Sequence, residues 1–228
     1  MSDWSAFTES VPWFVDAGQS VTIDDSRSRI TTSAAFQGRF PILASLLNSA
    51  RATRVTIGST EYDLIGWDSD DGFSIGWLCP ATVESAPDEL FEDHRLLLSV
   101  FGGVSERFNE PEDTWLLNHN DALTLRESGH DASFIADNQW AFEDAGIEIP
   151  IVLTDYYAIA REANGNTTLC HRKTGDVILF ASDHAYDHIT PLKECPEYTL
   201  YTIDEVPTFV DWVEEIARQW QSHIAKCA

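Results

Sequence analysis

Basic residues are scarce in this sequence. It contains 14 Lys and Arg residues against 38 Asp and Glu residues, which gives a formal net charge of −24 at pH 7. The acidic residues are spread evenly along the chain, without an acidic tail or a basic arm. A field of this sign repels nucleic acid and anionic membranes and attracts basic proteins. We therefore expect no nucleic-acid or membrane partner, and either a basic protein partner or a charge that serves solubility alone.

Long apolar runs are also missing. No stretch approaches the ~20 apolar residues that span a bilayer, and the N-terminal MSDWSAFTES has neither the basic nor the apolar region of a signal peptide. Cysteine is rare, and no pair reads as C-x-x-C, so zinc and thioredoxin-type motifs are not indicated. The four are Cys79, Cys170, Cys195 and Cys227. We expect a cytoplasmic protein with reduced thiols.

What the chain does contain is ample material for a core, since 43% of its 228 residues are hydrophobic. Three β-rich runs separated by Gly58-Ser59 and by the DSDDG turn predict an antiparallel meander. The runs are Arg54–Ile57, Tyr62–Trp67 and Phe73–Leu78. The proline-containing stretch 79–87 then indicates a boundary. We expect an N-terminal β-rich extension or subdomain over 1–86 and a second domain over 87–228.

The second region begins with an expected helix, PDELFEDHRLLLSVFGG, in which Gly102-Gly103 act as the C-terminal stop. The segment TWLLNHN is strand-like, and NQWAFEDAG predicts a short helix ending at Gly146. A hairpin follows, in which TTLCHR and DVILF flank a turn with Gly175 at positive φ. Because 177–180 is continuously apolar, we expect that strand to be central in its sheet.

The last helix is the clearest in the sequence. EVPTFVDWVEEIARQWQSHI has an apolar face that recurs with helical spacing. That face holds Val206, Phe209, Val210, Val213, Ile216, Ala217, Trp220 and Ile224, and the opposite face holds Glu214, Glu215, Arg218 and Gln219.

One pair of neighbours resembles a nucleophile and its base. Cys170 and His171 lie side by side in an expected strand. Successive side chains of a strand point to opposite faces, so they cannot form the hydrogen bond that such a pair needs. We interpret Cys170 as a packed strand residue.

A second candidate is the loop after the hairpin. His184 and His188 stand four residues apart and could share a metal ion with Asp187. The zincin pattern requires Glu directly after the first His, where this chain has Ala185. We favour a solvated loop without metal or other cofactor, and keep a metal-dependent hydrolase as an alternative. The NHND segment, 118–121, carries another His, but nothing in the sequence connects it to this loop.

The order of these elements resembles the SUKH superfamily, which includes a fungal cell-wall regulator and many bacterial immunity proteins. The resemblance spans roughly residues 87–220 and rests on turn glycines and core aromatics. The matching positions are Gly102-Gly103, Ile159-Ala160, Asn164-Gly165, Thr174-Gly175, Asp183-His184, Phe209 and Trp212. Before the hairpin, the family pattern has Gly-x-Gly-Asp where this chain has Ala-Asn-Gly-Asn.

The resemblance implies an α+β fold in which helices pack on one side of a curved, mainly antiparallel sheet. It also implies a non-enzymatic binding protein without catalytic residues. In bacteria the commonest role is that of an immunity protein, which binds and neutralises a cognate toxin, often a nuclease. A regulatory scaffold without a toxin partner is the other non-enzymatic alternative.

Acidic side chains on turns are the residues that we expect to contact a basic toxin, because rigid turns present charge at little entropic cost. They are Asp68, Asp70 and Asp71 in the meander, and Asp183 and Asp187 in the loop after the hairpin. The alternative is that these aspartates only keep the protein soluble.

Overall fold

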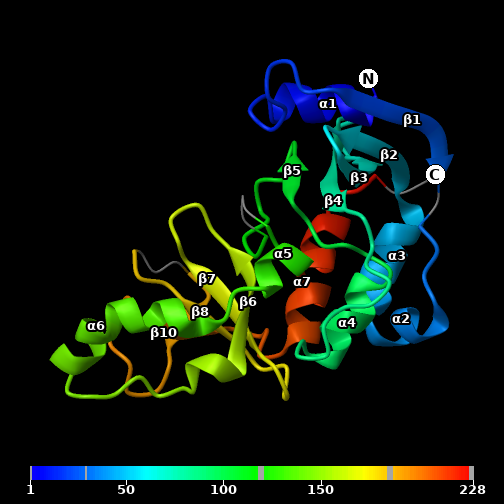
Figure 1. Cartoon of the computed structure of the whole chain (residues 1–228). Coiled ribbons are helices and arrows are strands. Elements are labelled where there is room, and N and C mark those ends of the chain that lie inside the picture. The colour runs from blue at the N-terminus through cyan, green and yellow to red at the C-terminus, as the bar shows by residue number, and fades with distance from the viewer. Residues whose placement is uncertain (1, 29, 118–120, 184–186, 226–228) are drawn as a thin grey trace.

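The chain folds into two antiparallel sheets joined by helices (Figure 1). The computed structural model describes residues 2–28, 30–117, 121–183 and 187–225, and at 25–28 only the backbone. Its two five-stranded sheets and short helices confirm the predicted α+β class. Within the described ranges, no helix has both the length and the apolar character that crossing a bilayer requires.

The first sheet has the order β1-β2-β3-β4-β5. Its strands are β1 (Val21–Ser28), β2 (Arg51–Ile57), β3 (Thr60–Asp68), β4 (Ser74–Pro80) and β5 (Glu106–Phe108). The three predicted runs lie in β2, β3 and β4, which pair in antiparallel register, with Val55 opposite Tyr62 and Ile65 opposite Trp77. The meander is thus confirmed. β1 was not predicted; it pairs with β2 from the far side.

The second sheet has the order β6-β7-β8-β10-β9. Its strands are β6 (Tyr156–Arg161), β7 (Thr167–His171), β8 (Val177–Phe180), β9 (Ile189–Pro191) and β10 (Leu200–Ile203). The predicted hairpin is β7–β8, and Gly175 in its turn has φ +73°. β8 lies between β7 and β10, which confirms the central position predicted from its apolar run. The run is continuous because both faces of the strand are buried: Val177 and Leu179 face one hydrophobic cluster, and Ile178 and Phe180 face another.

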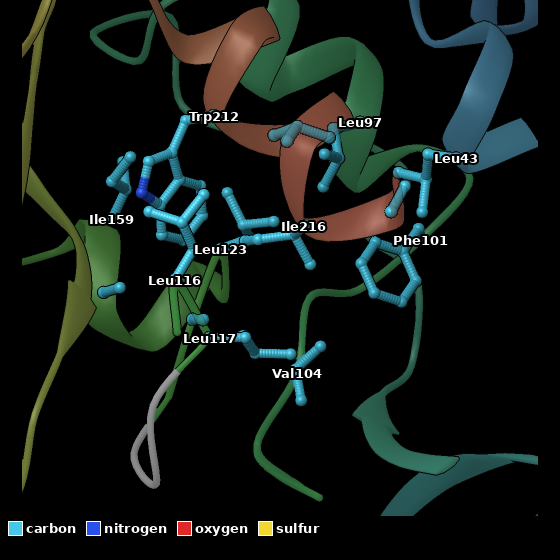
Figure 2. Close-up of a cluster of buried hydrophobic side chains, with 14 of the residues drawn as sticks. Leu43, Leu97, Phe101, Val104, Leu116, Leu117, Leu123, Ile159, Trp212 and Ile216 are labelled. Carbon is cyan, nitrogen blue, oxygen red and sulfur yellow. The ribbon is translucent and has the colours of Figure 1, made fainter. Parts of the chain in front are cut away.

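Helices cover both faces of each sheet. They are α1 (Asp3–Ser10), α2 (Ala34–Arg39), α3 (Pro41–Ser49), α4 (Glu92–Leu98), α5 (Leu125–Ser128), α6 (Gln139–Asp144), α7 (Phe209–Gln221) and the 3₁₀ turns η1 (Ala132–Asn138) and η2 (Leu153–Asp155). α3, α4 and α7 share the largest cluster with the inner faces of both sheets. Figure 2 shows the part of this cluster around Leu43, Leu97 and Ile216. α1 packs on the outer face of the first sheet, and η1 and α6 on that of the second. The one-sided packing that the resemblance implies does not describe this arrangement.

The helix α7 confirms the strongest sequence prediction, with one correction. Phe209, Val213 and Trp220 of its apolar face are buried, as expected. Glu214 was placed on the polar face, but it is buried as well and accepts hydrogen bonds from the backbone N–H groups of Ile42 (2.9 Å) and Leu43 (3.0 Å). These are free N–H groups of the first turn of α3, which a carboxylate stabilises.

The expected boundary near residue 87 does not separate two cores. β5 follows that boundary in sequence but completes the first sheet by pairing with β4. α3 precedes the boundary but packs against α7. One hydrophobic cluster therefore runs across both parts of the chain.

Two local predictions around α4 and α7 were wrong. Described residues 114–117 of the TWLLNHN segment form no strand; the N–H of Trp115 donates instead to the side chain of Gln219 on α7 (3.1 Å). Gly102-Gly103 do not cap α4, which already ends at Leu98. Gly103 has φ +84°, and a Cβ at Gly102 would lie 2.0 Å from the carbonyl oxygen of Pro80, so close backbone packing requires this pair.

Candidate partner-binding groove

A groove of about 560 Å³ opens beside the β3–β4 turn. It is bounded by that turn, by residues 109–113 after β5, and by His223 just after α7. We call it the hairpin groove. Its lining residues are Ser69, Asp70, Asp71, Phe73, Ile75, Asn109, Glu110, Pro111, Glu112, Asp113 and His223.

Most of the charge in the hairpin groove is uncompensated. Asp70 and Asp71 come from the turn, and Glu112 and Asp113 from the opposite wall. None of these four has an ion-pair partner in the part of the chain that the structure describes. Glu110 differs, because it pairs with a buried arginine of β5. Unpaired carboxylates on a concave surface concentrate a negative potential there.

The groove also has an apolar component. Phe73 stands at its rim and is 66% exposed, whereas Ile75 below it is buried. The N–H of Phe73 donates to the hydroxyl of Ser69 (3.1 Å), and Gly72 between them has φ +81°. These local constraints fix the backbone that carries the exposed aromatic ring beside Asp70 and Asp71. Exposed aromatic groups of this kind are enriched in protein–protein interfaces.

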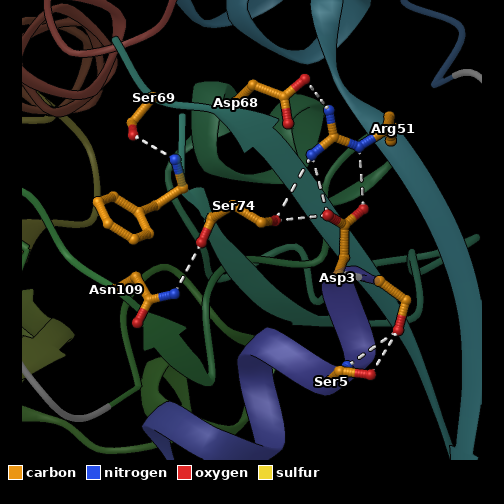
Figure 3. A network of polar contacts seen from close by, with 9 residues as sticks. Asp3, Ser5, Arg51, Asp68, Ser69, Ser74 and Asn109 are labelled. Atoms are coloured by element: carbon orange, nitrogen blue, oxygen red, sulfur yellow. Dashed lines mark hydrogen bonds and ion pairs between the residues drawn. The ribbon is translucent and has the colours of Figure 1, made fainter. Parts of the chain in front are cut away.

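Polar contacts fix the strands beneath the groove (Figure 3). Arg51 of β2 forms an ion pair with Asp3 of α1 (2.9 Å) and another with Asp68 at the end of β3 (2.8 Å). The hydroxyl of Ser74 donates to Asp3 (2.5 Å), and the side-chain amide of Asn109 donates to the carbonyl of Ser74 (2.8 Å). The groove therefore lies on a scaffold that involves α1 and three strands.

The C-terminal end of α7 is attached to the same turn. The N–H of Asp70 donates to the carbonyl of His223 (3.1 Å), and the N–H of Ala225 donates to the carbonyl of Asp68 (2.9 Å). The C-terminus of a helix carries the negative end of its dipole. This end adds to the negative potential of the carboxylates around it.

The structure distributes the five aspartates that we expect to contact a partner over three places. Asp70 and Asp71 line the hairpin groove, whereas Asp68 lies outside it with its carboxylate on Arg51. Asp183 and Asp187 are exposed in the loop after β8 and do not line the groove. The loop nevertheless contacts the segment that follows residues 109–113 in sequence, because His188 stacks on Trp115 with ring centroids 4.7 Å apart.

The groove residues that the sequence analysis did not single out are Ser69, Phe73, Ile75, the wall 109–113 and His223. The run NEPED, 109–113, was a visible signal, since it combines a proline with three acidic residues directly after a short strand. Its position opposite the β3–β4 turn was not visible, because β5 pairs with β4 only after a connection of more than twenty residues that contains α4.

The catalytic alternatives gain no support from the described residues. Cys170 is fully buried, and burial raises the pKa of its thiol to about 12. The Nδ1 atom of His171 instead accepts the N–H groups of Lys173 and Thr174 in the hairpin turn. His184 and residues 118–120 lie outside the described residues. Within the described ranges, no group of three or more His, Cys, Asp or Glu side chains is arranged to hold a metal ion.

Comparisons with models of protein families, with curated proteins and with solved structures each return no match to this chain.

Proposed function

We propose that the protein is a non-enzymatic binding protein that holds a basic protein in its hairpin groove, and that this partner is a toxin which the protein neutralises as an immunity protein. The observation that carries the proposal is the combination of four unpaired carboxylates with an exposed aromatic ring, Phe73, on one concave surface. The net charge of −24 supports the proposal, because it steers a basic protein toward this surface from a distance.

The charged and the aromatic contacts have different proposed roles in binding. Asp70, Asp71, Glu112 and Asp113 attract the partner and determine its orientation, which acts mainly on the association rate. Phe73 offers the apolar contact area that slows dissociation, as buried aromatic side chains do at interface hot spots. Asp183 and Asp187, in the loop after β8, remain proposed contacts outside the groove.

The test begins with capture of the partner from the native organism and its purification. Association rates are then measured at low and high salt for the wild type, for Asp70→Lys/Asp71→Lys and for a matched control, Asp137→Lys/Asp144→Lys, which makes the same charge change on exposed residues of η1 and α6. We expect steep salt dependence for the wild type and association slower by about tenfold or more in the groove variant. Equal rates for the groove variant and its control would refute the proposal.

A second measurement separates an immunity protein from a regulatory scaffold. The partner is expressed in a bacterial host alone, with the wild-type protein, and with the groove variant. An immunity protein predicts growth arrest by the partner alone, rescue by the wild type and weaker rescue by the variant. Normal growth with the partner alone would contradict a toxin and favour the scaffold.

A further inference from the structure

A second cavity lies at the other end of β5, between the two sheets. It has a charged half of about 630 Å³ and an apolar half of about 320 Å³, which share Ser105, Asp121 and Arg126. We call it the intersheet cleft. The charged half is further lined by Asp16, Glu106, Glu127, His130 and Arg161, and the apolar half by Tyr62, Pro80, Ala81, Val83 and Leu125.

A buried carboxylate stands where the two halves meet. Asp121 is only 4% exposed, and its backbone is held firmly, because the next residue, Ala122, bridges to Val104 beside the first sheet and to Ala160 of β6. The carbonyl of Asp121 also accepts the N–H of Arg161 (3.3 Å). A buried carboxylate is costly without a cation nearby. The ionised Asp121 side chain is therefore stable at this position only with a positively charged group beside it.

In this chain the positively charged group beside Asp121 is the guanidinium group of Arg126. Arg126 forms an ion pair with Asp121, yet its side chain is 78% exposed. It makes no other polar side-chain contact with the described residues. Arg161 is held more firmly, because it pairs with buried Glu127 (3.0 Å) and also lies over the ring of Phe134. Of the two arginines, Arg126 is therefore the one that another cation can displace more easily from its carboxylate.

We propose that the intersheet cleft binds the side chain of an arginine from another protein, with its guanidinium group on Asp121 in place of Arg126. Asp121 already takes a guanidinium group in this chain, and a planar guanidinium matches a carboxylate better than an ammonium group does. The hydrocarbon stem of the incoming arginine fits the apolar half, as amphipathic side chains bury their stems.

Two further features of the cleft suit such a ligand. Its lining holds four carboxylates against two guanidinium groups, so it attracts cations. Trp13, which is 68% exposed at the edge of the charged half, offers an aromatic face that a guanidinium group can stack on. The cleft is separate from the hairpin groove, since the two cavities lie at opposite ends of β5 and share no lining residue.

The test uses the whole protein and N-acetyl-arginine methylamide as the probe, followed by NMR titration of backbone amides. Arg126 is a tethered competitor, and a tethered group acts at millimolar effective concentration. Its removal in Arg126→Ala should therefore tighten probe binding by about tenfold or more. The control Arg218→Ala removes an exposed arginine from an ion pair on α7 and should leave the affinity unchanged.

Two more variants and a second probe complete the design. Asp121→Asn should abolish binding; if it fails to fold, Ala81→Trp serves instead, because it fills the apolar half and leaves the Asp121 carboxylate in place. N-acetyl-norleucine methylamide, which has a stem without a guanidinium group, should not bind. The proposal is overturned if Arg126→Ala binds no more tightly than the wild type, if Ala81→Trp binds as the wild type does, or if the norleucine probe binds equally well. This titration needs no partner protein, so a negative result leaves the hairpin-groove proposal standing.

Discussion

Two hairpin turns are attached to opposite ends of α7, and the glycine of only one of them is buried. At the N-terminal end, the N–H of Phe209 donates to the carbonyl of Gly175 in the β7–β8 turn (2.7 Å). At the C-terminal end, the β3–β4 turn binds the backbone just after the helix through Asp70. α7 therefore connects the two sheets from end to end (Figure 1).

The surroundings of the two turn glycines show how different the turns are. Gly175 and Gly72 have nearly the same backbone conformation, with φ +73° and +81°. A Cβ at Gly175 would lie 2.5 Å from the ring of Phe91, whereas a Cβ at Gly72 would meet nothing within 4 Å. The glycine of the β7–β8 turn is buried against the core, although Lys173, Thr174 and Asp176 beside it are exposed, whereas the β3–β4 turn forms a rim of the hairpin groove. Similar local sequence signals thus lead to opposite environments.

The largest expected contrast is between the aromatic residues beside the two turns. Phe209 is fully buried, with its ring centroid 4.9 Å from that of His94, and Phe73 is mostly exposed. Phe209→Ala should lower the free energy of unfolding by about 3–5 kcal/mol, and Phe73→Ala by no more than about 0.5 kcal/mol. Urea unfolding of both variants measures this. Similar losses for the two would show that α7 does not dock on the second sheet as described.

The next effect concerns pH near the N-terminal end of α7. His94 lies against Phe209, its ring nitrogens bond the Tyr157 hydroxyl (3.0 Å) and the Leu123 carbonyl (2.9 Å), and burial lowers its pKa to about 4. The unfolded value is about 6.5, so below that pH the unfolded chain binds a proton that the folded chain does not. Stability contributed by neutral His94 should therefore fall between pH 6.5 and 4, by about 3 kcal/mol.

Carboxylates titrate at the lower end of this range, so the measurement compares two proteins. Free energies of unfolding are determined from pH 7 to 4 for the wild type and for His94→Gln. The stability advantage of the wild type should shrink as pH falls. A constant difference across the range would contradict a neutral, buried His94.

The smallest contrast is between the turn glycines themselves. Both Gly175→Ala and Gly72→Ala put a side chain at positive φ, which costs about 1–2 kcal/mol in each case. Only Gly175→Ala also forces a methyl group into the ring of Phe91, and such overpacking adds about 1–3 kcal/mol. Thermal unfolding of both variants measures the additional destabilisation that overpacking causes in Gly175→Ala. Equal destabilisation would mean that the β7–β8 turn is not packed as tightly as the structure shows.

Elements with a strong local pattern were predictable from the sequence. The meander β2–β4, the β7–β8 hairpin and α7 all follow from apolar periodicity and turn residues, and each is confirmed. Elements without such a pattern were missed or misread. β1 and α1 lie in a stretch with little periodicity. Residues 114–117 resemble a strand in sequence because Trp115, Leu116 and Leu117 are apolar, but in the structure these side chains pack against α7 and the core around it.

The candidate site was only half predictable for a related reason. Asp70 and Asp71 stand out because a turn between two strands exposes charge, and they do line the hairpin groove. Asp68 looks the same in sequence, yet it pairs with Arg51 on the neighbouring strand. Which aspartates of a turn remain unpaired depends on strand register and on which side chains cross from the next strand, and single-sequence patterns do not contain that information.

By itself, the sequence determined the α+β class, the acidic surface and the elements whose apolar residues repeat with the period of a helix or a strand. These properties depend on composition and on residues close together in the chain. Only the tertiary structure decided that α7 lies between two sheets, that Glu214 is buried against α3, and that 109–113 faces the β3–β4 turn. The reason is physical: these contacts join residues far apart in sequence, and long-range packing chooses among local patterns that look alike.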